Sequence, residues 1–201
     1  MSARSANLQG ILWMVAAMAA FAVEDALIKR AAREMPIGEV LIVFGLGGAL
    51  AFLVLAYRDA AMLLRLQSLS RLMLVRMVFE LVGRLFYFLA VALTPLSAAT
   101  AILQATPVLV VLGAGLYFGE RVGWRRWLAV IAGLIGVLIV LRPSAADFSA
   151  LSMLTVVGMI GFAGRDLASR AAPPSLGARH LGFYGFLTVA LAGMLYAAWE
   201  G

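Results

Sequence analysis

The sequence predicts an all-α integral membrane protein, a polytopic bundle of about seven transmembrane helices. Hydrophobic residues make up 64% of the 201 residues and charged residues only 13%, and the mean hydropathy is +1.02. A soluble domain is typically about 45–50% apolar and about 25% charged. The apolar residues form continuous runs along the whole chain. This pattern excludes a soluble domain with one anchor and the alternating strands of a membrane β-barrel.

Seven apolar runs approach the length of about 20 residues that a helix needs to cross the hydrocarbon core. The expected spans are 8–28, 37–57, 72–93, 97–118, 124–141, 149–168 and 180–199. Most prolines lie between these spans, but Pro107 falls inside the fourth. A proline within a helix lacks the N–H that would pair with an earlier carbonyl, so we expect a helix kink at Pro107.

The distribution of basic residues predicts the orientation in the membrane. The net charge is +6, and most of the arginines lie between the apolar runs, on alternate connections. Counting Arg76 with the connection before the third span, the excess favours a cytoplasmic N-terminus. We therefore expect a multi-pass protein of a bacterial inner membrane and interpret the charge as an orientation signal, with no nucleic-acid partner.

Several chemistries lack the residues that they require. The chain has no cysteine and one histidine, His180, so we expect no disulfide, no metal site and no cofactor. The single lysine, Lys29, is not part of a nucleotide-binding P-loop. The helix-bundle composition and the absence of a His, Asp and Glu cluster predict that the chain is not an enzyme.

Glycines crowd the expected spans. Small residues allow helix backbones to approach closely in lipid, and we expect most of these glycines to pack the bundle. Gly115 and Gly119 form a GxxxG pair in the fourth span. This pair could instead contact a second copy, which leaves a homodimer open.

An internal similarity links the beginning and the end of the chain. Phe, Ala and Asp recur at matching positions of segments 21–25 and 162–166. Five expected helices separate the two segments, so the second copy would run in the opposite direction through the membrane. Inverted repeats of this kind are the architecture of many secondary transporters.

Glu80 and Arg84 are the strongest candidates for a functional site. They are four residues apart on one helix face, close to the middle of the third span, and Tyr87 continues this face. Charged side chains at this depth usually pair and face a cavity or another helix. We expect a substrate or proton site in which Glu80 titrates and Arg84 attracts anionic groups. The alternative is a structural ion pair between helices.

Glu24 and Asp25 lie late in the first span. They are candidates for an outer gate that pairs with Lys29 or Arg30, or they are side chains that simply reach the membrane interface. The same two interpretations apply to the matching acidic segment near the other membrane face.

That matching segment holds Arg165 and Asp166, which are candidates for an inner gate. Gln104 in the fourth span could bind substrate or a neighbouring helix. Glu120 and Arg121 follow this span and are expected to hold the turn in place rather than to bind a ligand.

The block at residues 98–143 resembles the EamA family of the drug/metabolite transporter superfamily. Pro107, the turn Gly119-Glu120-Arg121, and the glycine-rich helix that closes on Arg142-Pro143 carry the resemblance. The resemblance implies a first EamA five-helix repeat at 8–143 and a partial second repeat at 149–201.

The resemblance also implies a function. Family members usually have ten helices, and the seven expected here suggest a truncated product or a fragment. We expect a secondary-active transporter, exporter or importer, of a small metabolite or drug-like molecule. The alternative is a truncated, non-transporting membrane subunit or an inactive fragment of such a transporter.

Overall fold

The computed structural model describes residues 3–56, 70–142, 149–173 and 177–200. These residues are helical throughout, apart from short connections, and contain no strand. The helices are α1 (Ala3–Ala31), α2 (Ile37–Leu55), α4 (Arg71–Leu93), α5 (Leu96–Leu103), α6 (Thr106–Phe118), α7 (Trp124–Leu141), α8 (Ser152–Arg170) and α9 (Ala178–Glu200). The predicted all-α bundle is confirmed, with one expected span divided into α5 and α6.

Four stretches among the described residues are long and apolar enough to cross a membrane. They are Leu8–Ala31, Ile37–Leu55, Leu96–Phe118 and Ala178–Trp199. Helices α4 and α8 each carry several charged residues, which lower their mean hydropathy. The chain is therefore a polytopic helical membrane protein in which α4 and α8 carry charged residues inside otherwise apolar helices.

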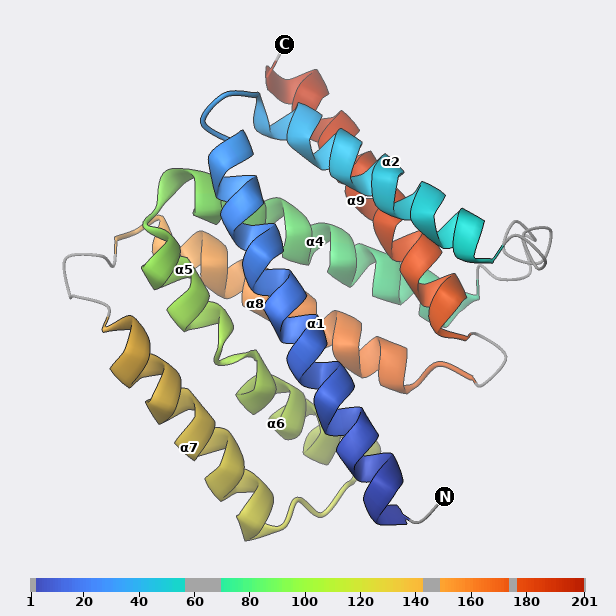
Figure 1. Cartoon of the computed structure of the whole chain (residues 1–201), viewed down its shortest axis with the longest axis vertical. Helices are drawn as coiled ribbons and strands as arrows, with labels where there is room; N and C mark the ends of the chain where they lie inside the picture. Colours follow the sequence, from blue (N-terminus) through green and yellow to red (C-terminus); the bar gives the residue numbers. More distant parts are fainter. Residues whose placement is uncertain (1–2, 57–69, 143–148, 174–176, 201) are drawn as a thin grey trace.

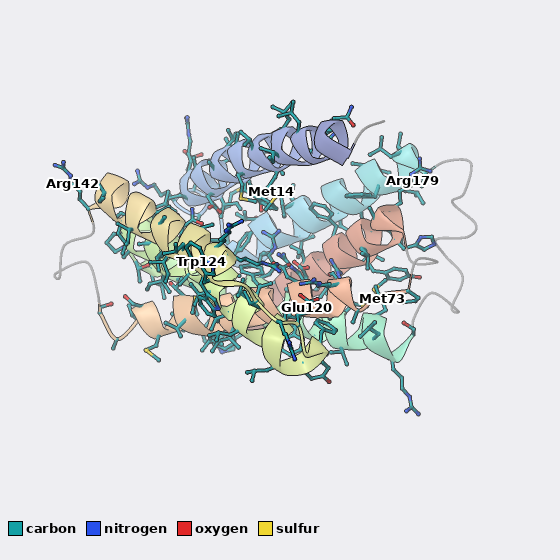
Figure 2. The ribbon with its side chains drawn as sticks, turned by 90° about the horizontal axis from the view of Figure 1, so that it is seen from below. Met14, Met73, Glu120, Trp124, Arg142 and Arg179 are labelled. Atoms are coloured by element: carbon teal, nitrogen blue, oxygen red, sulfur yellow. The ribbon has the colours of Figure 1, made fainter. Side chains whose placement is uncertain are left out.

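The helices pack mainly in two pairs. Helix α2 lies against α9, and α4 lies against α8. Figure 1 shows both pairs, with α1 crossing in front of α4 and α8, and α7 at the edge of the bundle away from α2 and α9. Helix α1 lies along one face of the molecule in Figure 2, where many of its side chains project outward. Its apolar residues, such as Leu12 and Trp13, are largely exposed, as lipid-facing residues should be.

Glycines allow the close approach within both pairs. A Cβ added at Gly45 of α2 would lie 2.3 Å from the backbone nitrogen of Ala190 in α9. A Cβ added at Gly161 of α8 would lie 2.4 Å from the backbone nitrogen of Gly83 in α4. These helices thus meet backbone to backbone. By contrast, a Cβ at Gly47 would have no described neighbour within 4 Å.

The fourth expected span is interrupted just before Pro107, where the kink was expected, and the residues between its two parts, Gln104 and Ala105, keep right-handed helical backbone. Helix α5 ends at Leu103 and α6 begins at Thr106, with Pro107 in its first turn. Because Pro107 has no N–H, the carbonyl of Leu103 lacks its usual helical partner. The hydroxyl of Thr106 donates to that carbonyl instead. Proline at the start of a helix is well tolerated, because the first N–H groups have no helical partner anyway.

Buried apolar side chains form two clusters within the bundle. The larger joins α1, α2, α4, α5, α8 and α9, and includes Leu41, Phe88 and Phe162. The second lies between α2, α4 and α9 and includes Met73 and Phe183. Helix α4 contributes to both clusters, so its buried face lies at the centre of the protein.

Candidate functional site

Four polar residues lie on the buried face of α4. The exposed fractions of Arg76, Glu80, Arg84 and Tyr87 are 8%, 4%, 8% and 2%. Their spacing of four, four and three residues places them on one side of the helix. The hydroxyl of Ser70 accepts from the backbone N–H of Met73 and caps the helix just before this series. We call these four residues and their side-chain partners on α1 and α8 the charge ladder.

Glu80 lies at the centre of the charge ladder and contacts three arginines. Its Oε1 is 3.3 Å from Nε of Arg84 and 3.4 Å from Nη1 of Arg165, and its Oε2 is 3.5 Å from Nη2 of Arg76. One carboxylate thus compensates cations from both α4 and α8. Pairing of this kind reduces the cost of burying charge in a membrane.

Arg84 joins α4 to α1. Its Nη1 lies 2.7 Å from Oε1 of Glu24, and its guanidinium carbon lies 5.6–5.8 Å from the ring centroids of Phe44, Phe88 and Phe162. A guanidinium is attracted to the faces of aromatic rings at this range. Two carboxylates and three rings therefore hold Arg84 in place. Glu24 pairs with this arginine, whereas Lys29 or Arg30 was the partner expected from the sequence.

Further along α4, α1 makes two more polar contacts. The hydroxyl of Tyr87 donates to Oδ2 of Asp25 at 2.9 Å. The ammonium of Lys29 donates to the carbonyl of Thr94 at 2.9 Å and to the carbonyl of Val91. The last carbonyls of a helix have no partner within it, so Lys29 satisfies the end of α4 instead of pairing with an acidic residue of a gate.

The Lys29 contacts lead to a stability prediction. Replacing Lys29 with methionine should lower the free energy of unfolding by about 1–2 kcal/mol, because hydrogen bonds from a charged donor contribute about 1.5–3 kcal/mol and this one is partly exposed. An SDS titration of the purified protein in detergent measures the loss. Arg30→Met is the matched control, because Arg30 is exposed. Equal losses in the two variants would contradict the capping role.

At the end of the charge ladder nearest the start of α4, the partners come from α8. Arg165 lies 2.7 Å from Oδ1 of Asp166 and also reaches Glu80. Nε of Arg76 donates to the hydroxyl of Ser169 at 2.9 Å. The expected inner pair of Arg165 and Asp166 is thus continuous with the central carboxylate. Asp25 is held by Tyr87 of α4, and Asp166 is held by its neighbour Arg165 of α8.

Arg76 is a member of the charge ladder that the sequence did not predict. The sequence suggests a place at the inner connection before the third span, whereas the structure buries Arg76 within α4. Arg76 is four residues before Glu80, and Glu80 is four residues before Arg84. This regular spacing was the feature of the sequence that could have placed Arg76 on the same buried face. An arginine near the end of an apolar run looks the same in sequence whether it faces water or the bundle.

Gln104 and Pro107 stand apart from the charge ladder. Both are exposed at the break between α5 and α6. Within the described part of the chain, no hydrogen bond or ion pair joins either residue to the ladder.

A second charged cluster forms where α6 ends. Oε1 of Glu120 lies 2.6 Å from Nη2 of Arg170, and its Oε2 lies 3.8 Å from Nη1 of Arg126. Gly119 ends α6 in the left-handed region with φ 64°. Figure 2 labels Glu120 and also Trp124, the first residue of α7. Glu120 therefore ties this turn to α7 and α8, and the role expected from sequence agrees with these contacts.

Comparison with known families identifies the chain. The model of the EamA-like transporter family matches residues 8–142, which is more than half of the sequence. The chain belongs to the EamA-like transporter family. The match covers α1 to α7, so the α1 and α4 parts of the charge ladder lie within the family region and the α8 part follows it.

Curated relatives of this EamA-like chain are named as transporters. The chain is 31% identical over 198 residues to a pseudopaline exporter of Pseudomonas aeruginosa, covering 95% of this chain and 66% of the relative. It is 30% identical over 160 residues to a riboflavin transporter of Vibrio cholerae, covering 78% and 53%. An S-adenosylmethionine uptake transporter of Rickettsia bellii is 30% identical over 79 residues, covering 39% and 27%.

The chain therefore spans about half to two thirds of the length of the first two of these relatives. No solved structure matches the chain.

Proposed function

We propose that this chain acts in the secondary-active transport of a small metabolite or drug-like molecule across a bacterial inner membrane, with its N-terminus in the cytoplasm. The charge ladder along α4 carries this proposal. Buried ionisable residues in membrane helices are costly and commonly mark substrate or ion pathways. Membership of the EamA-like family and the transporter names of the relatives support it.

In this proposal Glu80 is the group that takes up and releases a proton. Its carboxylate contacts Arg76 and Arg84 on its own helix and Arg165 on α8. Losing its negative charge would weaken the attraction between α4 and α8 and leave three cations less compensated. Protonation would then favour a movement of α8 relative to α4.

The ends of the charge ladder would act as gates. The outer gate consists of Glu24 with Arg84 and Asp25 with Tyr87, which join α1 to α4. The inner gate consists of Arg165 and Asp166. Opening either end requires α1 or α8 to give up charge-assisted contacts, which are stronger than hydrogen bonds between neutral groups.

The packing also supports the proposed division into a five-helix unit at 8–143 and the start of an inverted second unit at 149–201. Helices α2 and α9 would be the second helix of each unit, and they form one of the two main pairs. Equivalent helices of two repeats meet where the repeats are related by a two-fold axis, which in inverted repeats lies in the membrane plane.

The experiment is uptake by proteoliposomes that contain the purified 201-residue chain. The panel includes riboflavin and S-adenosylmethionine, because relatives are named for them, together with other small metabolites, each with and without a pH gradient. We expect saturable, gradient-dependent uptake of at least one compound. Glu80→Gln should abolish the pH dependence, while Glu34→Gln, at an exposed position of the α1–α2 connection, should preserve it.

Two results would count against the proposal. A correctly folded chain that transports no compound of the panel would favour the alternative, a non-transporting membrane subunit. Uptake with unchanged pH dependence in Glu80→Gln would remove Glu80 from the proton pathway while leaving transport in place. Circular dichroism and gel filtration of each variant establish that it is folded.

A further inference from the structure

Positive charge collects at the surface where α6 ends, α7 begins and α8 ends. We call the charged residues of this region the turn cluster; they are Glu120, Arg121, Arg125, Arg126 and Arg170. Four arginines against one glutamate leave a net charge of +3. The cluster follows the end of the apolar stretch Leu96–Phe118, so it should lie at the level of the lipid headgroups.

The arginines of the turn cluster are exposed and only partly compensated. Glu120 lies 2.6 Å from Nη2 of Arg170 and 3.8 Å from Nη1 of Arg126, so one carboxylate serves two guanidinium groups. These two side chains are still 42% and 50% exposed. Arg121 and Arg125 are also exposed, and neither forms an ion pair with a described carboxylate. Because each guanidinium has five N–H donors, the cluster keeps donors that can bind an anion.

The acidic residue nearest to Arg170 along α8 does not neutralise this charge. Asp166 precedes Arg170 by one helical turn. Its carboxylate lies 2.7 Å from Nη2 of Arg165. Asp166 is therefore already paired within the charge ladder.

An exposed apolar stripe of α7 begins at the turn cluster. Trp124 is 67% exposed, and the guanidinium carbon of Arg125 lies 5.7 Å from the centroid of its ring. Tryptophan is enriched at the membrane–water interface. Spacings of three and four residues continue this face along the helix, through the exposed residues Leu128, Ile131, Ile135 and Leu138. A molecule bound here meets guanidinium groups at one end and an apolar helix face along its length.

Helix α7 presents this stripe at the outside of the described structure. It lies at the edge of the bundle in Figure 1 and packs mainly against α5 and α6. Among the described side chains of α7, none is buried. A long apolar ligand thus reaches the stripe from the membrane without entering the bundle.

We propose that the turn cluster binds the phosphate of an anionic phospholipid whose acyl chains lie along the exposed stripe of α7. Arginine pairs with phosphate through two parallel hydrogen bonds. The stripe extends about 21 Å from Trp124 to Leu138, which exceeds the about 15 Å of one leaflet of the hydrocarbon core. The positive charge favours an anionic lipid over a zwitterionic one, whose headgroup has no net charge. This site is separate from the charge ladder and from the proposed transport.

Glu120 competes with the lipid phosphate. Its carboxylate already binds Arg126 and Arg170, so a phosphate must share these guanidinium groups or displace it. Glu120→Gln should therefore strengthen lipid binding, although it weakens the tie between the turn, α7 and α8 when no lipid is bound. A cluster with a structural role alone would show the loss of stability without the gain in lipid binding.

Quenching of tryptophan fluorescence by brominated lipids tests the site. The chain has four tryptophans, and Trp13→Phe with Trp199→Phe leaves Trp124 and Trp127 of α7 as the fluorophores. This full chain is reconstituted in phosphatidylcholine vesicles that contain increasing shares of phosphatidylglycerol, with one or the other lipid brominated on its acyl chains. We expect quenching by phosphatidylglycerol to saturate, with a half-saturating mole fraction about tenfold or more below that of phosphatidylcholine, because each arginine near an anionic lipid contributes about fivefold.

Arg125→Gln with Arg126→Gln is the decisive variant. It keeps the contact between Glu120 and Arg170, so it should fold, and the half-saturating mole fraction of phosphatidylglycerol should rise about tenfold or more. Arg30→Gln with Arg33→Gln removes the same charge from exposed positions of another connection and should leave that value unchanged. Glu120→Gln should lower it about fivefold.

Three results would overturn the proposal. The first is equal half-saturating mole fractions for the two lipids. The second is an unchanged value in the double variant of Arg125 and Arg126 or, if circular dichroism shows that variant to be unfolded, in Glu120→Gln. The third is displacement of phosphatidylglycerol by added glycerol 3-phosphate, which would identify a soluble phosphate compound as the ligand.

Discussion

Replacing Gly161 with alanine is expected to lower the free energy of unfolding by about 3 kcal/mol or more. The new Cβ would lie 2.4 Å from the backbone nitrogen and 2.6 Å from the Cα of Gly83. Overpacking in a core typically costs about 1–3 kcal/mol. The cost should reach or exceed the upper end here, because the obstacle is backbone and α4 and α8 must move apart to remove the clash.

The same argument applies to the other helix pair. Gly45→Ala places a Cβ 2.3 Å from the backbone nitrogen of Ala190 and should be similarly destabilising. Gly47→Ala is the matched control on the same helix, and it should be neutral or gain up to about 1 kcal/mol from the higher helix propensity of alanine. Unfolding of each variant in SDS and detergent mixtures measures these changes. Similar stabilities for Gly45→Ala and Gly47→Ala would refute backbone contact between α2 and α9.

Replacing Arg84 with methionine is expected to cost about 3–5 kcal/mol, because breaking a buried ion pair leaves its partner charge uncompensated. The side chains of Glu24 and Glu80 that remain are only 16% and 5% exposed. Methionine fills much of the volume of arginine, so lost packing contributes little. The free energy of unfolding in SDS and detergent mixtures again measures the effect.

Arg126→Met is the control for charge removal. Arg126 is 50% exposed and 3.8 Å from Glu120, and surface ion pairs contribute about 0–1 kcal/mol. Adding Glu24→Gln to Arg84→Met should recover part of the loss, because it removes one of the two orphaned carboxylates. Comparable losses for Arg84→Met and Arg126→Met would show that the charge ladder does not stabilise the bundle.

The arrangement of the charge ladder gives α4 a central mechanical role. The contacts with α1 lie on the later half of α4, through Arg84 and Tyr87, and the contacts with α8 lie on its first half, through Arg76 and Glu80. Glu80 and Arg84 also contact each other. A charge change at Glu80 therefore acts on both neighbouring helices of α4.

Local spacing explains what sequence reasoning could find in the site. Glu80 and Arg84 are four residues apart on one helix, so their contact follows from helix geometry alone. The partner of Arg84 on α1 could not be predicted in this way. Glu24 is 60 residues away, and the contact depends on how α1 is rotated against α4. Lys29 follows Glu24 and Asp25 by one helical turn, which suggested a local ion pair. In the folded protein, Lys29 instead donates to the carbonyls at the end of α4.

The sequence by itself determined the fold class and the positions of the helices, because the length and continuity of apolar runs are set by the thickness of the membrane. It also determined that charge lies inside the bundle, because Glu80 and Arg84 lie within the third apolar run. Only the tertiary structure decided which charges meet. Helices of similar hydropathy can pack through several faces, and close contacts at glycines such as Gly83 and Gly161 select one of them. That choice turns Arg76 inward and brings Glu24 and Arg165 from distant parts of the chain to the charged face of α4.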